Sequence, residues 1–121
     1  SYTKFVGTRG KIITVITAYQ VCDKPVTTAT KKKSRTAAAQ QASMMRQRGI
    51  TNAHPRKQFC KDLMLSMQAC KTQHEELLLA GDFNEALGTN LSGMTKLCTD
   101  LGLVDIMQSH HDGTDTTPTY V

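Results

Sequence analysis

An apolar run that ends at a glycine and is followed at once by polar side chains most constrains what this chain can fold into. Residues 77–80 read Leu-Leu-Leu-Ala, and the next five read Gly-Asp-Phe-Asn-Glu. A short apolar run of this kind predicts a buried β-strand, and Gly81 has no Cβ, so another backbone or a phosphate can come close. Phe83 is expected to turn into the core and leave Asp82 and Asn84 on the opposite side. The pattern therefore predicts a sheet edge that carries a carboxylate and a carboxamide, where α/β proteins hold their ligands.

The same residues also fit a plain turn. Asp and Asn are common turn residues because their side chains hydrogen-bond to the backbone two residues further along the chain. From spacing alone, a structural turn and a ligand site are equally good interpretations of Asp82 and Asn84.

The size and composition of the chain allow one domain, over residues 1–121. No apolar run approaches the roughly 18 residues that a membrane span needs, so we expect no membrane partner. The four cysteines have no CxxC spacing, which favours reduced, mostly buried thiols in an intracellular protein of unknown compartment over a disulfide framework. These cysteines are Cys22, Cys60, Cys70 and Cys98.

The net charge of +5 fits a polyanionic partner, although many ordinary domains are equally basic. Positive charge gathers at residues 31–35 and again at Arg46 and Arg48. The first cluster fits either a contact with a nucleic-acid backbone or a solvated loop.

Two strands and a pair of helices are expected in the first two thirds of the chain. Residues 11–19 are rich in β-branched side chains with apolar groups on both faces, which predicts a central strand. An exposed loop and a surface helix are expected at about residues 22–54, with the helix at 35–48. A longer helix should begin at Pro55 and end near residues 71–74, before the strand at 75–80. Its buried stripe consists of Phe59, Leu63, Met67 and Cys70.

A third helix is expected to begin with Ser92 as its cap and to end at Gly102. Residues 103–107 should be extended or a short helical turn, with Asp105 in a structural role. Residues 117–121 read as the beginning of a further strand. This order of elements predicts the α/β class: the central part of a layered α/β sandwich with helices packed on a mixed sheet.

Three segments together resemble the endonuclease/exonuclease/phosphatase superfamily, the deoxyribonuclease I-like metal-dependent phosphodiesterases. The segment LLLAGDFN at residues 77–84 is similar to the GDFN signature of that family. The strand at 12–19 resembles the family strand that ends in a substrate-facing tyrosine. The segment LGLVD at 101–105, followed by Pro-Thr-Tyr at 118–120, resembles the stretch after the signature. The match is closest in style to the endonuclease domains of non-LTR retrotransposons.

The resemblance implies hydrolysis of a phosphodiester by a metal-activated water. Asp82 is implied to orient or deprotonate that water, or to bind a second metal ion. Asn84 is implied to hold a phosphate oxygen, and Tyr19 to face the phosphate. The implied cofactor is Mg2+, which prefers hard oxygen ligands, and the implied partner is DNA or another nucleic acid.

The chain also departs from the family pattern. A proline usually follows the family tyrosine, whereas Gln20 and Val21 follow Tyr19. Neither the early metal-binding glutamate nor the closing Ser-Asp-His motif has a match. We therefore expect the middle of a catalytic domain, truncated at both ends, inactive alone and completed by missing flanking segments.

Three functions remain open at this point. The first is a fragment of a mobile-element endonuclease. The second is a non-catalytic, basic remnant that binds nucleic acid without cutting it. The third is a family phosphatase that acts on inositol phosphates or lipids.

Overall fold

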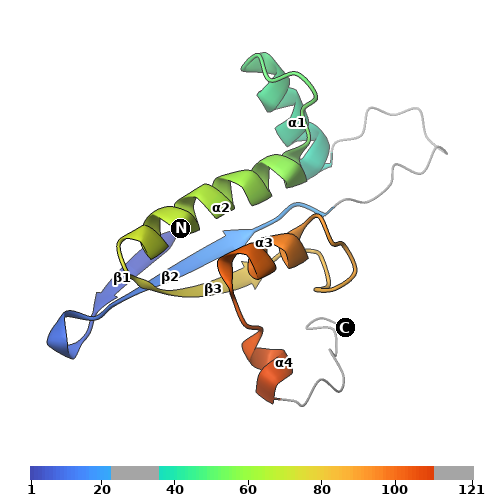
Figure 1. The fold of residues 1–121 in the computed structure, drawn as a ribbon. Coiled ribbons are helices and arrows are strands. Elements are labelled where there is room, and N and C mark those ends of the chain that lie inside the picture. The colour runs from blue at the N-terminus through green and yellow to red at the C-terminus, as the bar shows by residue number, and fades with distance from the viewer. Residues whose placement is uncertain (23–35, 111–121) are drawn as a thin grey trace.

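The computed structural model describes residues 1–22 and 36–110 (Figure 1). The expected loop before residue 35, the basic run at 31–35 and the expected strand at 117–121 lie outside these residues. In chain order the elements are β1 (Tyr2–Val6), the 3-10 turn η1 (Thr8–Gly10), β2 (Ile12–Tyr19), α1 (Ala37–Gln47), α2 (Pro55–Thr72), β3 (Glu76–Asp82), α3 (Met94–Leu101) and α4 (Ile106–His110).

The three strands form one mixed sheet in the order β1-β2-β3. β1 and β2 make an antiparallel hairpin, and β2 and β3 run parallel on either side of the crossover through α2. The predicted central strand is confirmed, as is the α/β class with helices on a mixed sheet. β1 is a strand that the local sequence does not predict, and it forms because Tyr2 to Val6 pair with Ile16 to Ile12.

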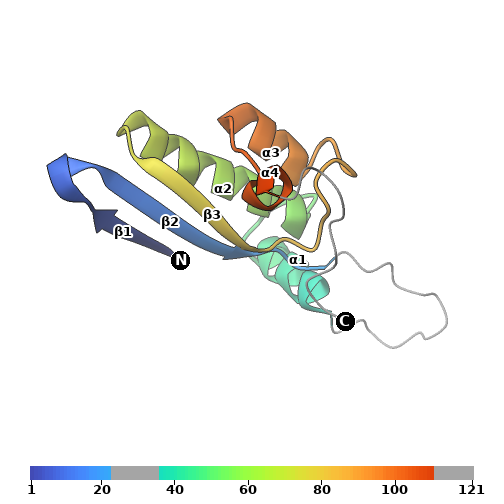
Figure 2. The same cartoon turned by 90° about the horizontal axis from the view of Figure 1, so that it is seen from below.

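Helices α2 and α3 cover one face of the sheet (Figures 1 and 2). The core between them contains Met67 at 0% exposure and Leu97 at 2%, with Ile16 of β2 beneath. The predicted stripe on α2 is confirmed, since Leu63 and Met67 are buried while Phe59 and Cys70 are half-buried. Burial of this stripe, together with the apolar side chains of β2 and α3 that meet it, stabilises the packing of the helices on the sheet.

The opposite face of the sheet has no covering layer among the described residues. Phe5 is 56% exposed, Ile13 42% and Leu78 40%. The prediction that residues 75–80 form a buried strand is therefore wrong on this face, although Leu77 and Leu79 pack towards the helices. An apolar run of this length cannot by itself indicate whether one or both faces are covered.

Helix α1 is a surface helix, as predicted. It begins after Thr36, whose side chain accepts a hydrogen bond from the backbone of Ala39 at 3.2 Å. Only Ala42 of this helix is buried. Figure 1 places α1 beyond the end of the sheet where β2 and β3 finish.

For α3, the predicted end is confirmed and the predicted start is wrong. Gly102 ends the helix in the left-handed conformation (φ 65°), as predicted. Ser92 is not its cap, because the helix begins at Met94, whose N–H donates to the carboxylate of Glu85 at 3.0 Å. Asp105 has the expected structural role, since its Oδ1 accepts from the N–H groups of Met107 and Gln108 at the start of α4.

All four cysteines are free, as predicted, but they are half-buried, whereas mostly buried thiols were expected. Within residues 1–22 and 36–110, no helix combines the length and apolar character required to cross a bilayer.

Candidate functional site

Tyr19 and Asp82 are register partners at the carboxyl ends of the two parallel strands. Tyr19 is 60% exposed, and Asp82 is exposed as well. Because partners in a ladder leave a sheet on the same side, both side chains belong to the uncovered face. Two residues separated by more than sixty positions of sequence thus meet at the sheet edge where α/β proteins bind ligands.

Gly81 allows the two strands to meet in this way. A Cβ built on Gly81 would stand 1.8 Å from the carbonyl oxygen of Ala18, far inside van der Waals contact. Gly81 lies within β3, one residue before its end, so the strand extends beyond the predicted range of 75–80. The close approach expected at this glycine is present, and it is made by the backbone of the neighbouring strand.

Asp82 and Asn84 form the turn that follows β3. The N–H of Asn84 donates to Asp82 Oδ1 at 3.0 Å, and Asn84 has the left-handed backbone conformation (φ 47°) that Asn tolerates better than most residues. Asn84 Nδ2 donates to the carbonyl of Gln20 at 2.7 Å, while the N–H of Gln20 donates to the carbonyl of Asp82 at 2.9 Å. Phe83 turns into the core as expected, 6.4 Å from the ring of Phe59.

These contacts confirm the turn interpretation of the motif, and they leave some of its polar atoms available to a ligand. Asp82 Oδ1 is used by the turn, while Oδ2 meets no hydrogen-bond donor among the described residues. Asn84 uses one N–H of its amide on Gln20, and a primary amide has a second N–H and an acceptor oxygen. The edge therefore still offers an acceptor, a donor and the phenol of Tyr19 to a ligand.

Arg56 and Glu85 were not singled out from the sequence, yet they lie directly beneath this turn. Arg56 Nη2 and Glu85 Oε2 are 2.9 Å apart, with side chains only 13% and 4% exposed. Arg56 also donates to the carbonyl of Val21 at 2.8 Å and, at 3.4 Å, to that of Asn84. The available signals were slight: Glu85 follows the GDFN motif directly, and Arg56 follows the proline that begins α2.

A second buried carboxylate lies at the other end of the sheet. Glu75 is 7% exposed and accepts hydrogen bonds from Lys4 and Thr14. The bond from Lys4 and then the bond from Thr14 lower the pKa of Glu75, and the partnership raises the pKa of Lys4. This cluster is distant along β3 from Asp82 and takes no part in the candidate site.

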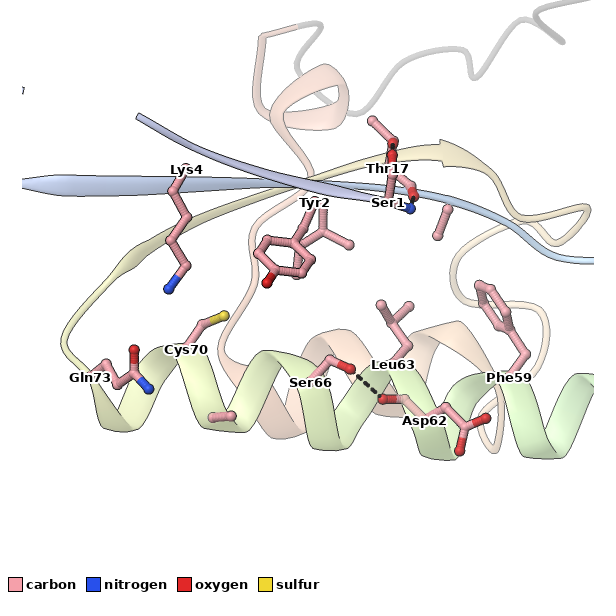
Figure 3. A pocket seen from close by; sticks show the side chains of 13 residues that line it. Ser1, Tyr2, Lys4, Thr17, Phe59, Asp62, Leu63, Ser66, Cys70 and Gln73 are labelled. Atoms are coloured by element: carbon pink, nitrogen blue, oxygen red, sulfur yellow. Dashed lines mark hydrogen bonds between the residues drawn. The ribbon is translucent and has the colours of Figure 1, made fainter. Parts of the chain in front are cut away.

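A hollow between β1 and α2 lies near this second cluster (Figure 3). Tyr2 and Lys4 point into it from the sheet, and Leu63 and Cys70 from the helix. A second, more open hollow reaches Tyr19 at the end of β2, and neither hollow is lined by Asp82 or Asn84.

The described residues do not form a metal centre. No three His, Cys, Asp or Glu side chains among them gather closely enough to hold an ion. Glu85, the acid nearest to Asp82 in sequence, is engaged by Arg56 and by the start of α3. Among the described residues, Asp82 is thus the one carboxylate of this turn that is left for a cation, and Mg2+ is usually bound through one or two carboxylates together with waters and substrate phosphates.

The chain matches no protein-family model, and no curated protein or solved structure is significantly similar to it.

Proposed function

We propose that this chain is part of a phosphodiesterase of endonuclease type that acts on nucleic acid. The observation that carries the proposal is the register of Tyr19 with Asp82 at the carboxyl ends of adjacent parallel strands. It supports the pairing of two residues that the superfamily resemblance had implied separately. Asn84 follows in the same turn.

In the proposed chemistry, each of these residues has a distinct task. Asp82 Oδ2 accepts a proton from the attacking water, or orients that water, while Oδ1 holds the turn. The free N–H of Asn84 and the hydroxyl of Tyr19 donate to phosphate oxygens, where negative charge grows during displacement. Mg2+ belongs to the proposal through the resemblance alone, with Asp82 as its candidate ligand; when bound it would polarise the phosphoryl oxygen.

The charge around the same end of the molecule supports a nucleic-acid substrate. Residues 36–61 contain five Lys and Arg side chains and no Asp or Glu. Arg46, Arg48 and Lys57 are exposed, at the end of α1 and the start of α2. In Figure 1, α1 lies beyond the end of the sheet where β2 and β3 finish. A duplex that reaches the candidate site would pass close to them, so its phosphates would be partly neutralised.

Titration with a short DNA duplex, followed by backbone amide NMR, tests the substrate class. We expect the signals of Tyr19, Asp82 and Asn84 to shift first, while signals of the β1–β2 turn stay in place. Chemical-shift changes confined to other parts of the chain would contradict the proposal.

A plasmid-nicking assay with Mg2+ tests catalysis, with Asp82→Ala as the variant and Asp100→Ala as an exposed control. We expect little or no nicking by the chain alone, because the described residues bring no metal ligand set together. Nicking that depends on Mg2+ and vanishes only in Asp82→Ala would establish a complete active site and contradict the idea of an inactive fragment. Phosphate release from inositol phosphates in place of DNA binding would favour the phosphatase alternative.

A non-catalytic nucleic-acid-binding role is the second candidate. It is favoured by the same lack of a metal centre among the described residues, combined with the basic surface. It predicts duplex affinity that Asp82→Ala leaves unchanged or improves, since a carboxylate repels phosphate.

A further inference from the structure

The turn that carries Asp82 and Asn84 rests on a buried ionic network that the proposed chemistry does not use. We propose that Arg56 and Glu85 are positioning residues, which hold this turn in the geometry required for phosphodiester binding. The inference rests on the proposed function for its purpose, whereas the clamp itself can be tested without any activity.

Arg56 joins the ends of both parallel strands. Its Nη1 donates to the carbonyl of Val21, just past β2, and its guanidinium lies 3.4 Å from the carbonyl of Asn84, just past β3. Gln20, 1% exposed, completes the set. With its amide nitrogen turned towards the carbonyl of Phe83 (3.2 Å), its oxygen accepts from Arg56 Nε at 3.1 Å. A planar guanidinium can reach all these acceptors at once, whereas a lysine ammonium cannot.

Glu85 extends the same network to α3. One carboxylate oxygen accepts from Arg56 at 2.9 Å, and the other accepts from the N–H of Met94 at 3.0 Å. A carboxylate at the first turn of a helix is also favoured by the helix dipole. Gly93 leaves room for it, because a Cβ at that position would stand 2.2 Å from Glu85 Oε1.

The network therefore connects β2, β3, α2 and α3 at one point beneath the turn. Asn84 has a left-handed backbone, a conformation that Asn tolerates but that is still less favourable than the right-handed one, so its contacts help to hold it. The carbonyl of this residue faces Arg56, and its side chain binds Gln20. Loss of the guanidinium would free the two strand ends to separate and Asn84 to leave this conformation.

The chain contains a matched control for this inference. Glu75 is a second nearly buried carboxylate in an ion pair, with a side chain 2% exposed against 4% for Glu85. It lies at the opposite end of β3 and makes no contact with the turn. If Glu85 served only general stability, replacing either carboxylate would affect the turn to the same extent.

The test compares Arg56→Lys, Glu85→Gln and Glu75→Gln in the full chain by amide hydrogen exchange. We expect the N–H groups of Gln20 and Asn84 to exchange about tenfold faster or more in the first two variants, as for loss of a hydrogen bond to a charged group. Amides in the middle of β2 and β3 should change much less. In Glu75→Gln, the exchange of Gln20 and Asn84 should follow only the change of the whole domain. Equal acceleration throughout the sheet in all three variants would overturn the positioning role.

Glu85→Gln keeps an acceptor for the N–H of Met94. If Arg56→Lys does not fold, the comparison of Glu85→Gln with Glu75→Gln still tests the inference. A duplex titration of the same variants then separates the two proposals. Weaker binding in Arg56→Lys and Glu85→Gln, with Glu75→Gln unchanged, supports positioning for phosphodiester binding. Faster local exchange with no duplex binding by any form, the natural chain included, would remove the proposed function and leave a structural clamp in place of a positioning pair.

Discussion

The backbone of Gly81 lies so close to Ala18 that its missing side chain decides whether β2 and β3 can pair at their carboxyl ends. The hypothetical Cβ and the Ala18 oxygen would be 1.8 Å apart, and the atom in the way belongs to rigid backbone. This contact is directly beside the pair formed by Tyr19 and Asp82. The geometry of the candidate site and the stability of the sheet thus depend on the same glycine.

Gly81→Ala should lower the free energy of unfolding by about 3 kcal/mol or more, because the strands must move apart to admit the methyl group. Gly7→Ala is the control: its Cβ would meet the carbonyl oxygen of Lys11 at an ordinary 3.5 Å. We expect that variant to stay within about 0.5 kcal/mol of the natural chain in urea unfolding. Similar stabilities for the two variants would contradict the close contact.

Met67→Ala tests the core between α2 and the sheet. Met67 is 0% exposed, and its truncation should cost about 2 to 5 kcal/mol through lost burial and the cavity left behind. Leu65 is two positions away on the same helix but is 58% exposed, so Leu65→Ala should cost less than about 1 kcal/mol. Thermal or urea unfolding of both variants measures the difference, and equal losses would mean that α2 is turned differently.

Acid should weaken the fold in part through Glu75. The hydrogen bonds from Lys4 and Thr14 lower the pKa of Glu75 in the folded state, so the ionised form stabilises the fold at pH above the ordinary carboxyl pKa of about 4.3. This contribution is lost as the pH falls below that value and through the lowered pKa of the folded state. Urea midpoints measured from pH 7 to pH 3 should fall less steeply in Glu75→Gln; parallel curves for the two proteins would argue against the ion pair.

The basic surface on α1 should appear in the salt dependence of duplex binding. Each phosphate contact contributes about 0.9 to the slope of log affinity against log salt. Replacing Arg46 and Arg48 with Gln should therefore reduce that slope by up to about 2. Replacing Arg9 and Lys11 with Gln removes the same charge from the far end of the sheet and should leave the slope nearly unchanged. A larger effect from the second pair would place the nucleic acid elsewhere.

Elements whose pattern is local could be predicted from the sequence. The stripe from Phe59 to Cys70 specifies α2 by its own periodicity, and the β-branched run at 12–19 specifies β2. The left-handed end of α3 at Gly102 is a property of glycine itself. The pairing of Tyr19 with Asp82 follows only once the two strands are known to be parallel neighbours.

Features that depend on distant partners could not be predicted. β1 exists because a hairpin turn brings it against β2. Ser92 has the right chemistry for a cap, yet the start of α3 is bound by the carboxylate of Glu85, nine residues before Met94. The pair of Arg56 and Glu85 is separated by 29 positions, and nothing in the local sequence of either residue indicates the other.

The second face of the sheet, which no described residue covers, is continuous with the candidate site. Side chains alternate along β2 and β3, so Tyr19 and Asp82 emerge on the same side as Ile13 and Leu78. A layer of protein that covered this whole face would necessarily contact the surroundings of Tyr19 and Asp82. Completion of the fold and enclosure of the candidate site would then be a single event, and a mutation chosen to improve solubility on that side would also alter access to Tyr19 and Asp82.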